Sequence, residues 1–318
     1  MSAADLFNAI FNASLTVMLL TLVASLGMTF SVKQILQPLR RVWLLVGTLV
    51  VNSGLAPLVA IGVCHLFPLP SEAQVGVAIV TIAAAGPAGL KACELAKRAD
   101  MAMAVSFTIV LQLVNIVVAP LWAKVIVTGA KVNPWSIVVD LLLLVLAPLV
   151  VGLVLRGRYP EHRDSWKAGL EKISNIALYI AIGVGLAANW KSVVSVVGSW
   201  VVLASVVIVV AYVVLGWAVA FRNQQAAVTI SMMSAMRFTP IGLVVISTVL
   251  HNQGGYLAPA LVFALIDTII PFVTGAEIGR YLTRRGHEPA HAADVAPRVP
   301  AAAVASSSSG PATSARPT

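Results

Sequence analysis

The chain of 318 residues is very hydrophobic, because 59% of its residues are apolar and only 10% are charged. A soluble domain carries roughly 25% charged residues, so an ordinary water-exposed protein is excluded and the bilayer is the expected solvent. The formal net charge is +9. This charge lies mostly in segments between apolar stretches, so we interpret it as a topology signal and expect no nucleic-acid partner.

Apolar stretches long enough to cross a bilayer recur along the chain, and we predict nine spans. They cover residues 11–30, 42–65, 73–98, 101–127, 134–156, 168–188, 197–221, 224–250 and 257–283. The N-terminus carries Asp5 and lacks the basic segment and cleavage site of a signal peptide, so the first span should be retained. Residues 1–285 are then one transmembrane domain. Residues 286–318 are rich in Ala, Ser and Pro and are expected to be a disordered C-terminal tail.

The distribution of Lys and Arg predicts the orientation, since cytoplasmic loops are enriched in them. With the N-terminus outside, the inner segments hold fourteen basic residues, namely Lys33, Arg40, Arg41, Lys97, Arg98, Arg156, Arg158, Arg163, Lys167, Lys172, Arg222, Arg280, Arg284 and Arg285. The outer segments hold three, namely Lys124, Lys131 and Lys191. We therefore expect an outside N-terminus, a cytoplasmic C-terminus and an odd number of spans in a cell inner or plasma membrane.

Two proline breaks of the same form interrupt apolar stretches in opposite halves of the chain, P-A-G-L at Pro87–Leu90 and P-I-G-L at Pro240–Leu243. Proline removes a helical hydrogen bond, and the following glycine lets the backbone unwind further. The breaks lie in the third and eighth spans, which cross in opposite directions, as in the inverted repeats of secondary transporters. We predict an all-α membrane transporter with an inverted repeat, whose two broken helices cross in a core domain. A simple kink at each proline is the alternative.

Two basic residues lie close to these breaks. Lys91 follows the first proline by four residues, and Arg237 precedes the second by three. An ionisable side chain within a span costs about 2.5–3.5 kcal/mol on insertion scales, so it usually faces a cavity or an opposite charge. One interpretation is that both meet an organic anion. The alternatives are a local pair of Lys91 with Glu94 and an ion pair of Arg237 with Asp267 in the ninth span.

A polar stripe is predicted on the fourth span, where Thr108, Gln112 and Asn115 follow each other at spacings of four and three residues and share one helical face. Such a stripe either joins helices by hydrogen bonds or lines a cavity, and both interpretations stay open. The predicted substrate-binding residues are Pro87, Gly89, Lys91, Thr108, Gln112, Asn115, Arg237, Thr239 and Pro240. Glu94 and Asp267 are the carboxylates best placed for coupling to protons.

The order and spacing of several stretches resemble the bile acid:sodium symporter family over most of residues 15–285. These stretches are L-G-M-T-F-S-V-K-Q-I-L from Leu26, R-R-V-W-L-L-V-G from Arg40, L-P-S-E-A-Q-V-G-V from Leu69, the G-P-A-G break at 86–89, L-A-K-R-A-D-M-A-M-A-V from Leu95, and L-A-P-L-V-V-G-L-V-L-R from Leu146. The resemblance implies a panel subdomain and a core subdomain, with alternating access by their relative motion. Relatives with ten spans have one more at the N-terminus, which agrees with nine spans here.

The resemblance also implies where sodium would bind, and this chain departs from the family there. The family uses a Ser-Asn pair after the first break, a Ser-x3-Thr pattern in the next span, and Glu and Gln in the second broken helix. Here no Ser-Asn pair follows Gly89, and the Ser-x3-Thr positions are Ala104 and Thr108. Ser231 or a neighbour stands where the Glu would be. We therefore expect sodium coupling to be weak or absent.

These observations predict a secondary transporter of a small organic anion, with passive or proton-coupled uptake. The alternatives are a sodium- or proton-coupled symporter of another small solute and a membrane sensor with a transporter fold. Within transport, an arsenite exporter or an auxin-carrier-like protein is a further alternative. No enzyme, cofactor or metal site is predicted, because all five histidines lie at span ends, in loops or in the tail, and no H-E-x-x-H, G-x-S-x-G or P-loop motif occurs. Cys64 and Cys93 are too far apart in topology to suggest a disulfide.

Overall fold

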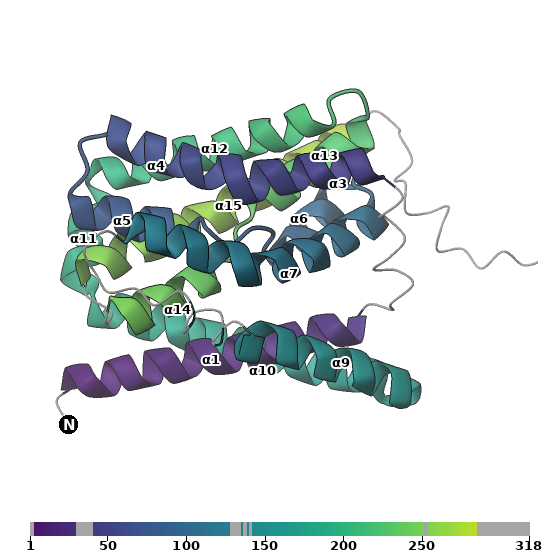
Figure 1. Cartoon of the computed structure of the whole chain (residues 1–318), viewed down its shortest axis with the longest axis horizontal. Coiled ribbons are helices and arrows are strands. Elements are labelled where there is room, and N and C mark those ends of the chain that lie inside the picture. Colours follow the sequence, from purple (N-terminus) through teal and green to yellow (C-terminus); the bar gives the residue numbers. More distant parts are fainter. Residues whose placement is uncertain are drawn as a thin grey trace, which may run out of the picture.

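The computed structural model describes residues 3–29, 41–127, 135, 139, 142–250 and 254–284, and every regular element in these ranges is a helix (Figure 1). The long helices are α1 (Ala3–Thr29), α7 (Met101–Ile126), α10 (Arg163–Ala188), α12 (Trp200–Val219) and α15 (Gly254–Arg284). The shorter elements are α3 (Val42–Leu49), η2 (Val50–Leu55), α4 (Ala56–Leu66), α5 (Ser71–Val80), α6 (Ala88–Ala96), η3 (Leu142–Leu146), α9 (Ala147–Arg158), η4 (Pro160–His162), α11 (Trp190–Val197), α13 (Gln224–Ala235) and α14 (Thr239–Val249). The all-α prediction is confirmed for this part of the chain.

Seven stretches of the described residues are long and apolar enough to cross a membrane, so the chain is a multi-pass membrane protein. They are Leu6–Thr29, Val42–Leu66, Met101–Ile126, Pro160–Ala188, Trp200–Val219, Gln224–Val249 and Gly254–Tyr281. The expected third span contains two short helices, α5 and α6, and the expected fifth span is described mainly from Leu142 onward. Nine spans and the inverted repeat therefore stay predictions, and the predicted tail at 286–318 lies outside the described residues.

The helices form two groups. α1 packs along α10 and α9, at the bottom of Figure 1. α15 packs against α5, α6 and α12 in the other group, and α12 packs against α13. The contact between the groups includes α1 against α14. This division is the arrangement that a panel and a core would have, and the assignment of these two roles stays a prediction.

The second span changes its helical form in front of a proline. Pro57 has no N–H to bond the carbonyl four residues earlier, that of Ser53. The segment before it, η2, is π-helical, and the Ser53 carbonyl accepts a hydrogen bond from the indole N–H of Trp122 at 2.7 Å instead. The same letters L-A-P-L-V recur at Leu146–Val150, where Leu146 is again the last residue of a π-helical segment, η3. π-helical turns are frequent at functional sites, and η2 reaches the candidate site described next.

Candidate functional site at the helix crossing

Both predicted breaks are non-helical in the structure. The first break is residues 81–87, between α5 and α6. The second break is residues 236–238, between α13 and α14. Pro87 caps α6 and Pro240 lies in the first turn of α14, where a missing N–H costs no helical hydrogen bond. Each proline therefore starts a half-helix, and the alternative of a simple kink is wrong.

The two breaks cross in direct backbone contact. The N–H of Phe238 donates to the carbonyl of Ala83 at 3.0 Å, and the N–H of Gly86 donates to the carbonyl of Met236 at 2.9 Å. A Cβ at Gly86 would lie 2.5 Å from the carbonyl oxygen of Arg237, far inside van der Waals contact, so the crossing requires glycine at this position. The structure thus brings together the two segments that the sequence singled out.

The polar stripe on α7 holds the first break. The amide of Asn115 donates to the carbonyl of Ala84 at 3.0 Å, and its Oδ1 accepts from the N–H of Ala84 at 3.2 Å. Gln112 donates to the carbonyl of Ala85 at 3.0 Å. Backbone groups freed by an interrupted helix need such partners in a buried site. These contacts fit the first interpretation of the stripe, in which its side chains join helices by hydrogen bonds. Thr108 donates to a carbonyl of its own helix at 2.8 Å.

Asp267 on α15 holds the second break in a similar way. Its two carboxylate oxygens accept hydrogen bonds from the backbone N–H of Arg237 at 3.2 and 3.0 Å, and the side chain is 1% exposed. Among the described residues, this carboxylate forms no ion pair with the guanidinium of Arg237. The expected alternative, an ion pair between the two side chains, is therefore replaced by a contact of the carboxylate with the backbone.

The guanidinium of Arg237 is buried at the same point, with the residue 2% exposed. Its Nη1 donates to the carbonyl of Asn52, in η2, at 3.3 Å, and its central carbon lies 4.2 Å from the ring centroid of Tyr212. Its Nε and Nη2 have no hydrogen-bond partner among the described residues. Stacking on a tyrosine ring stabilises a cation, but two buried donor nitrogens without acceptors are costly. The arrangement therefore suits a ligand that brings acceptor atoms.

Further buried polar side chains lie on η2, which contacts this guanidinium, and on α13, which ends two residues before Arg237. Asn52 donates to Ser234 Oγ at 2.8 Å, whereas its own Oδ1 has no partner within the described residues. Ser231, three residues before Ser234 on α13, likewise has an unpartnered hydroxyl in that part of the chain. We call Asn52, Tyr212, Ser231, Ser234 and Arg237 the buried polar cluster.

Sequence reasoning did not identify Tyr212 or Ser234 as members of this cluster. A signal for Tyr212 was present, because it is a tyrosine near the middle of a valine-rich span, while tyrosines usually lie at the membrane interfaces. Its hydroxyl donates to the carbonyl of Ala56 at 2.9 Å, which ties α12 to the second span. Ser234 has no comparable signal, since serines are common in membrane helices.

Lys91 and Glu94 lie in a different environment. The ammonium of Lys91 binds Glu94 Oε2 at 2.6 Å, and the two side chains are 65% and 51% exposed. This is the local ion pair that the sequence predicted as the alternative to binding of an anion by Lys91. Lys91 is thus exposed and paired, whereas Arg237 is buried with open donors. The structure does not bring the two predicted basic groups together, and the roles of Lys91 and Glu94 stay predictions.

The other predicted residues lie close to the crossing. A Cβ at Gly89 would lie 3.2 Å from the sulfur of Met233, which itself lies 3.9 Å from the Thr108 hydroxyl. Thr239 is half-buried and begins α14. Within the described residues, no three His, Cys, Asp or Glu side chains gather as metal ligands would.

Known proteins resemble parts of this sequence. The model of the Sodium Bile acid symporter family matches residues 16–215. A protein of Bacillus subtilis (strain 168), described as "Uncharacterized sodium-dependent transporter YocS", is 26% identical over 179 residues, which is 55% of this chain. The match covers 54% of that protein, so the chain spans about half the length of the relative. With more than half of its residues matched by the family model, the chain belongs to the sodium bile acid symporter family.

Proposed function

We propose that this protein is a secondary transporter that carries a small organic anion by alternating access, with sodium coupling weak or absent. The observation that carries the proposal is the guanidinium of Arg237, which is buried beside the crossing of the two breaks and keeps two nitrogens without a partner in the described part of the chain. A carboxylate or sulfonate supplies the acceptors that these nitrogens need, in charge-assisted hydrogen bonds. Buried methionines near the crossing, Met232, Met233 and Met236, adapt to varied apolar bodies.

The same guanidinium opposes sodium. A monovalent cation about 6 Å from it is repelled by about 3 kcal/mol at an effective dielectric constant near 20, roughly a hundredfold in affinity. Within the described residues, the carboxylate nearest the crossing, Asp267, accepts the backbone N–H of Arg237 with both oxygens. A fixed positive charge then takes the electrostatic place of a bound cation.

A sodium symporter is the second candidate. The B. subtilis relative is named a sodium-dependent transporter, and two oxygens of the buried polar cluster, Asn52 Oδ1 and Ser231 Oγ, lack partners among the described residues. Neutral oxygens are acceptable sodium ligands. This candidate requires that they outweigh the repulsion from Arg237, so the two proposals differ in one measurable quantity, the dependence of ligand binding on sodium.

Thermal unfolding of the purified protein tests both candidates with cholate, benzoate and 2-naphthalenesulfonate as probes, beside neutral amides and amines of similar size. We expect stabilisation by the anions alone, equal in sodium chloride and choline chloride. Arg237→Met, which keeps an unbranched apolar stem but removes the guanidinium, should weaken anion binding at least tenfold, and Arg237→Lys should retain part of it. Arg222→Met, at an exposed arginine on a cation–π contact with Phe221, is the control and should change nothing.

Two results contradict the anion proposal. One is stabilisation by the neutral or cationic probes only. The other is anion binding that survives Arg237→Met unchanged. Binding that rises steeply with sodium and still needs Arg237 supports the symporter and removes the claim of sodium independence. Proteoliposome uptake of a stabilising anion then separates a transporter from a membrane sensor, because a sensor binds the anion without moving it.

A further inference from the structure

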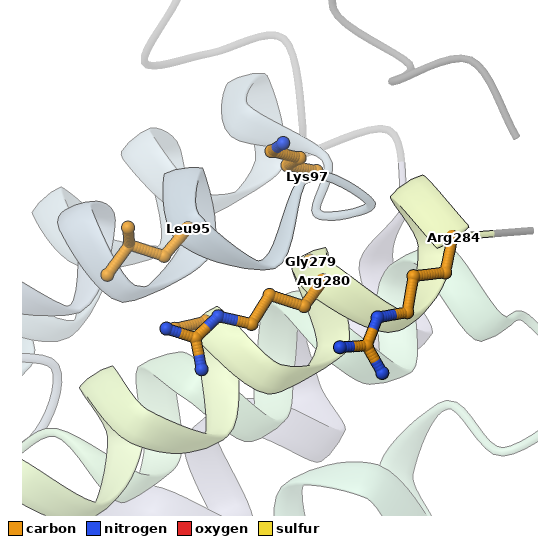
Figure 2. Close-up of a pocket in the computed structure, with 6 residues that line it drawn as sticks. Leu95, Lys97, Gly279, Arg280 and Arg284 are labelled. Atoms are coloured by element: carbon orange, nitrogen blue, oxygen red, sulfur yellow. The ribbon is translucent and has the colours of Figure 1, made fainter. Parts of the chain in front are cut away.

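A basic pocket lies at the ends of α6 and α15, apart from the crossing. It has a volume of about 470 Å³ and is lined by Leu95, Lys97, Ala276, Gly279, Arg280 and Arg284 (Figure 2). Figure 2 shows Lys97 on the turn after α6, across from the two arginines on α15. Three of the six lining residues are cationic, so the pocket suits an anionic group.

Close packing of the two helices creates this pocket. A Cβ at Gly279 would lie 2.1 Å from the carbonyl oxygen of Leu95, and one at Gly275 would lie 2.6 Å from that of Ala92, so the backbones of α15 and α6 touch there. α6 then ends at Ala96, and the next residue, Lys97, adopts a left-handed conformation with φ 54° and turns the chain away. The long basic side chains on either side of this backbone contact form the walls.

The charge of the pocket remains positive after its internal pairing. Arg280 Nη1 binds Glu277 Oε1 at 2.6 Å, on the exposed side of α15. Arg284, one turn later, forms no ion pair with any other residue that the structure describes. Arg284 thus keeps a positive charge in the pocket that no carboxylate of the described residues offsets. Arginine binds phosphate in bidentate fashion, and lysine adds a point charge.

An apolar strip continues from the pocket along α15. Val273 and Ile269 lie seven and eleven residues before Arg280, which places all three on one face of the helix, and both apolar side chains are exposed. Leu95 adds exposed apolar surface at the pocket itself. On a membrane-spanning helix such a strip faces lipid chains. The pocket and the strip together therefore match a molecule with a phosphate at one end and a hydrocarbon chain at the other.

We propose that this pocket binds the headgroup phosphate of an anionic phospholipid, with an acyl chain along Val273 and Ile269. Basic pockets between membrane helices on the cytoplasmic side are recognised sites for anionic headgroups, and the ends of α6 and α15 belong to the inner side predicted from the basic residues. The bound lipid bridges α6, the second half of the first broken helix, to α15, which carries Asp267. This proposal does not depend on the transported solute.

The test compares the association of spin-labelled phosphatidylglycerol and spin-labelled phosphatidylcholine with the full chain in phosphatidylcholine vesicles. The measured quantity is the ratio of the two association constants. We expect phosphatidylglycerol to be preferred. Each basic residue removed should lower that preference about fivefold, so Lys97→Gln with Arg284→Gln should lower it roughly 25-fold. The control is Arg158→Gln with Arg222→Gln, two exposed arginines outside the pocket, and it should change the preference less than twofold.

Equal association of the two lipids, or equal losses in the pocket and control variants, overturns the proposal. Displacement of the labelled phosphatidylglycerol by 10 mM inorganic phosphate at constant ionic strength also overturns it, because the ligand is then a soluble anion. Where the double variant fails to fold, Arg284→Gln alone, at the exposed end of α15, tests the same proposal. It should lower the preference for phosphatidylglycerol about fivefold.

Discussion

Asn115→Leu should destabilise the protein strongly, because one side chain satisfies both backbone groups of Ala84. Leucine has the same branching at Cγ but neither donates nor accepts, so the N–H and the carbonyl of Ala84 would lose their partners at 3.2 and 3.0 Å. Each buried backbone group left unsatisfied costs about 1–3 kcal/mol, which gives about 2–6 kcal/mol for the pair. Even the lower figure changes the folding equilibrium roughly thirtyfold.

The matched control is Thr108→Val on the same face of α7. The Thr108 hydroxyl donates to the carbonyl of Ala104, which is also the acceptor of the helical hydrogen bond from the backbone at 108, so its loss leaves no backbone group unsatisfied. The two free cysteines, Cys64 and Cys93, are buried and report unfolding through a thiol-reactive dye. Equal unfolding midpoints for the two variants, or a loss below about 1 kcal/mol in Asn115→Leu, would refute the role of the α7 amides.

Two further predictions concern the crossing and the topology. Gly86→Ala should sharply lower the yield of folded protein, because its Cβ would lie 2.5 Å from the Arg237 carbonyl oxygen. The control is Gly62→Ala, whose Cβ would have no heavy atom within 4 Å and which should leave the yield unchanged. Similar yields of the two variants would contradict the close crossing. Reporter fusions should place Met1 outside and Thr318 in the cytoplasm, and finding both ends on one side would show that the predicted number of spans is wrong.

The breaks could be predicted from sequence because proline and glycine change the backbone itself, wherever the side chains around them point. The environment of Lys91 could not be read from its distance to Pro87, because it depends on the rotation of α6 about its own axis. The small residues Gly89, Ala92, Cys93 and Ala96 determine that rotation, because they recur at helical spacing and form the buried face of α6. Lys91 falls outside this stripe. The stripe was present in the sequence and would have predicted an exposed lysine.

The buried polar cluster was harder to predict, because its members come from segments far apart in the chain. Asn52 lies in η2 and Tyr212 on α12, 160 positions further along the chain, and nothing in the local sequence of either residue indicates that the two lie close together. The carbonyl of Asn52 that accepts from Arg237 lies within the π-helical turn ahead of Pro57. Sequence patterns report local geometry, whereas this cluster depends on how three separate helices pack around the second break.

Asp267 connects the second break to the charge of Arg237, and this suggests how protons would couple to an anion. As a carboxylate it accepts the N–H of Arg237 with both oxygens and offsets part of the guanidinium charge nearby. A proton on Asp267 removes this negative charge, so the guanidinium attracts an anion more strongly, and binding of the anion favours the proton in turn.

We therefore expect uptake of a stabilising anion to rise with an inward proton gradient. Asp267→Asn, which mimics the protonated form, should abolish that dependence while retaining anion binding in the thermal assay. Proton-dependent uptake that persists in Asp267→Asn would rule out this carboxylate as the coupling group and leave Glu94 as the remaining predicted one.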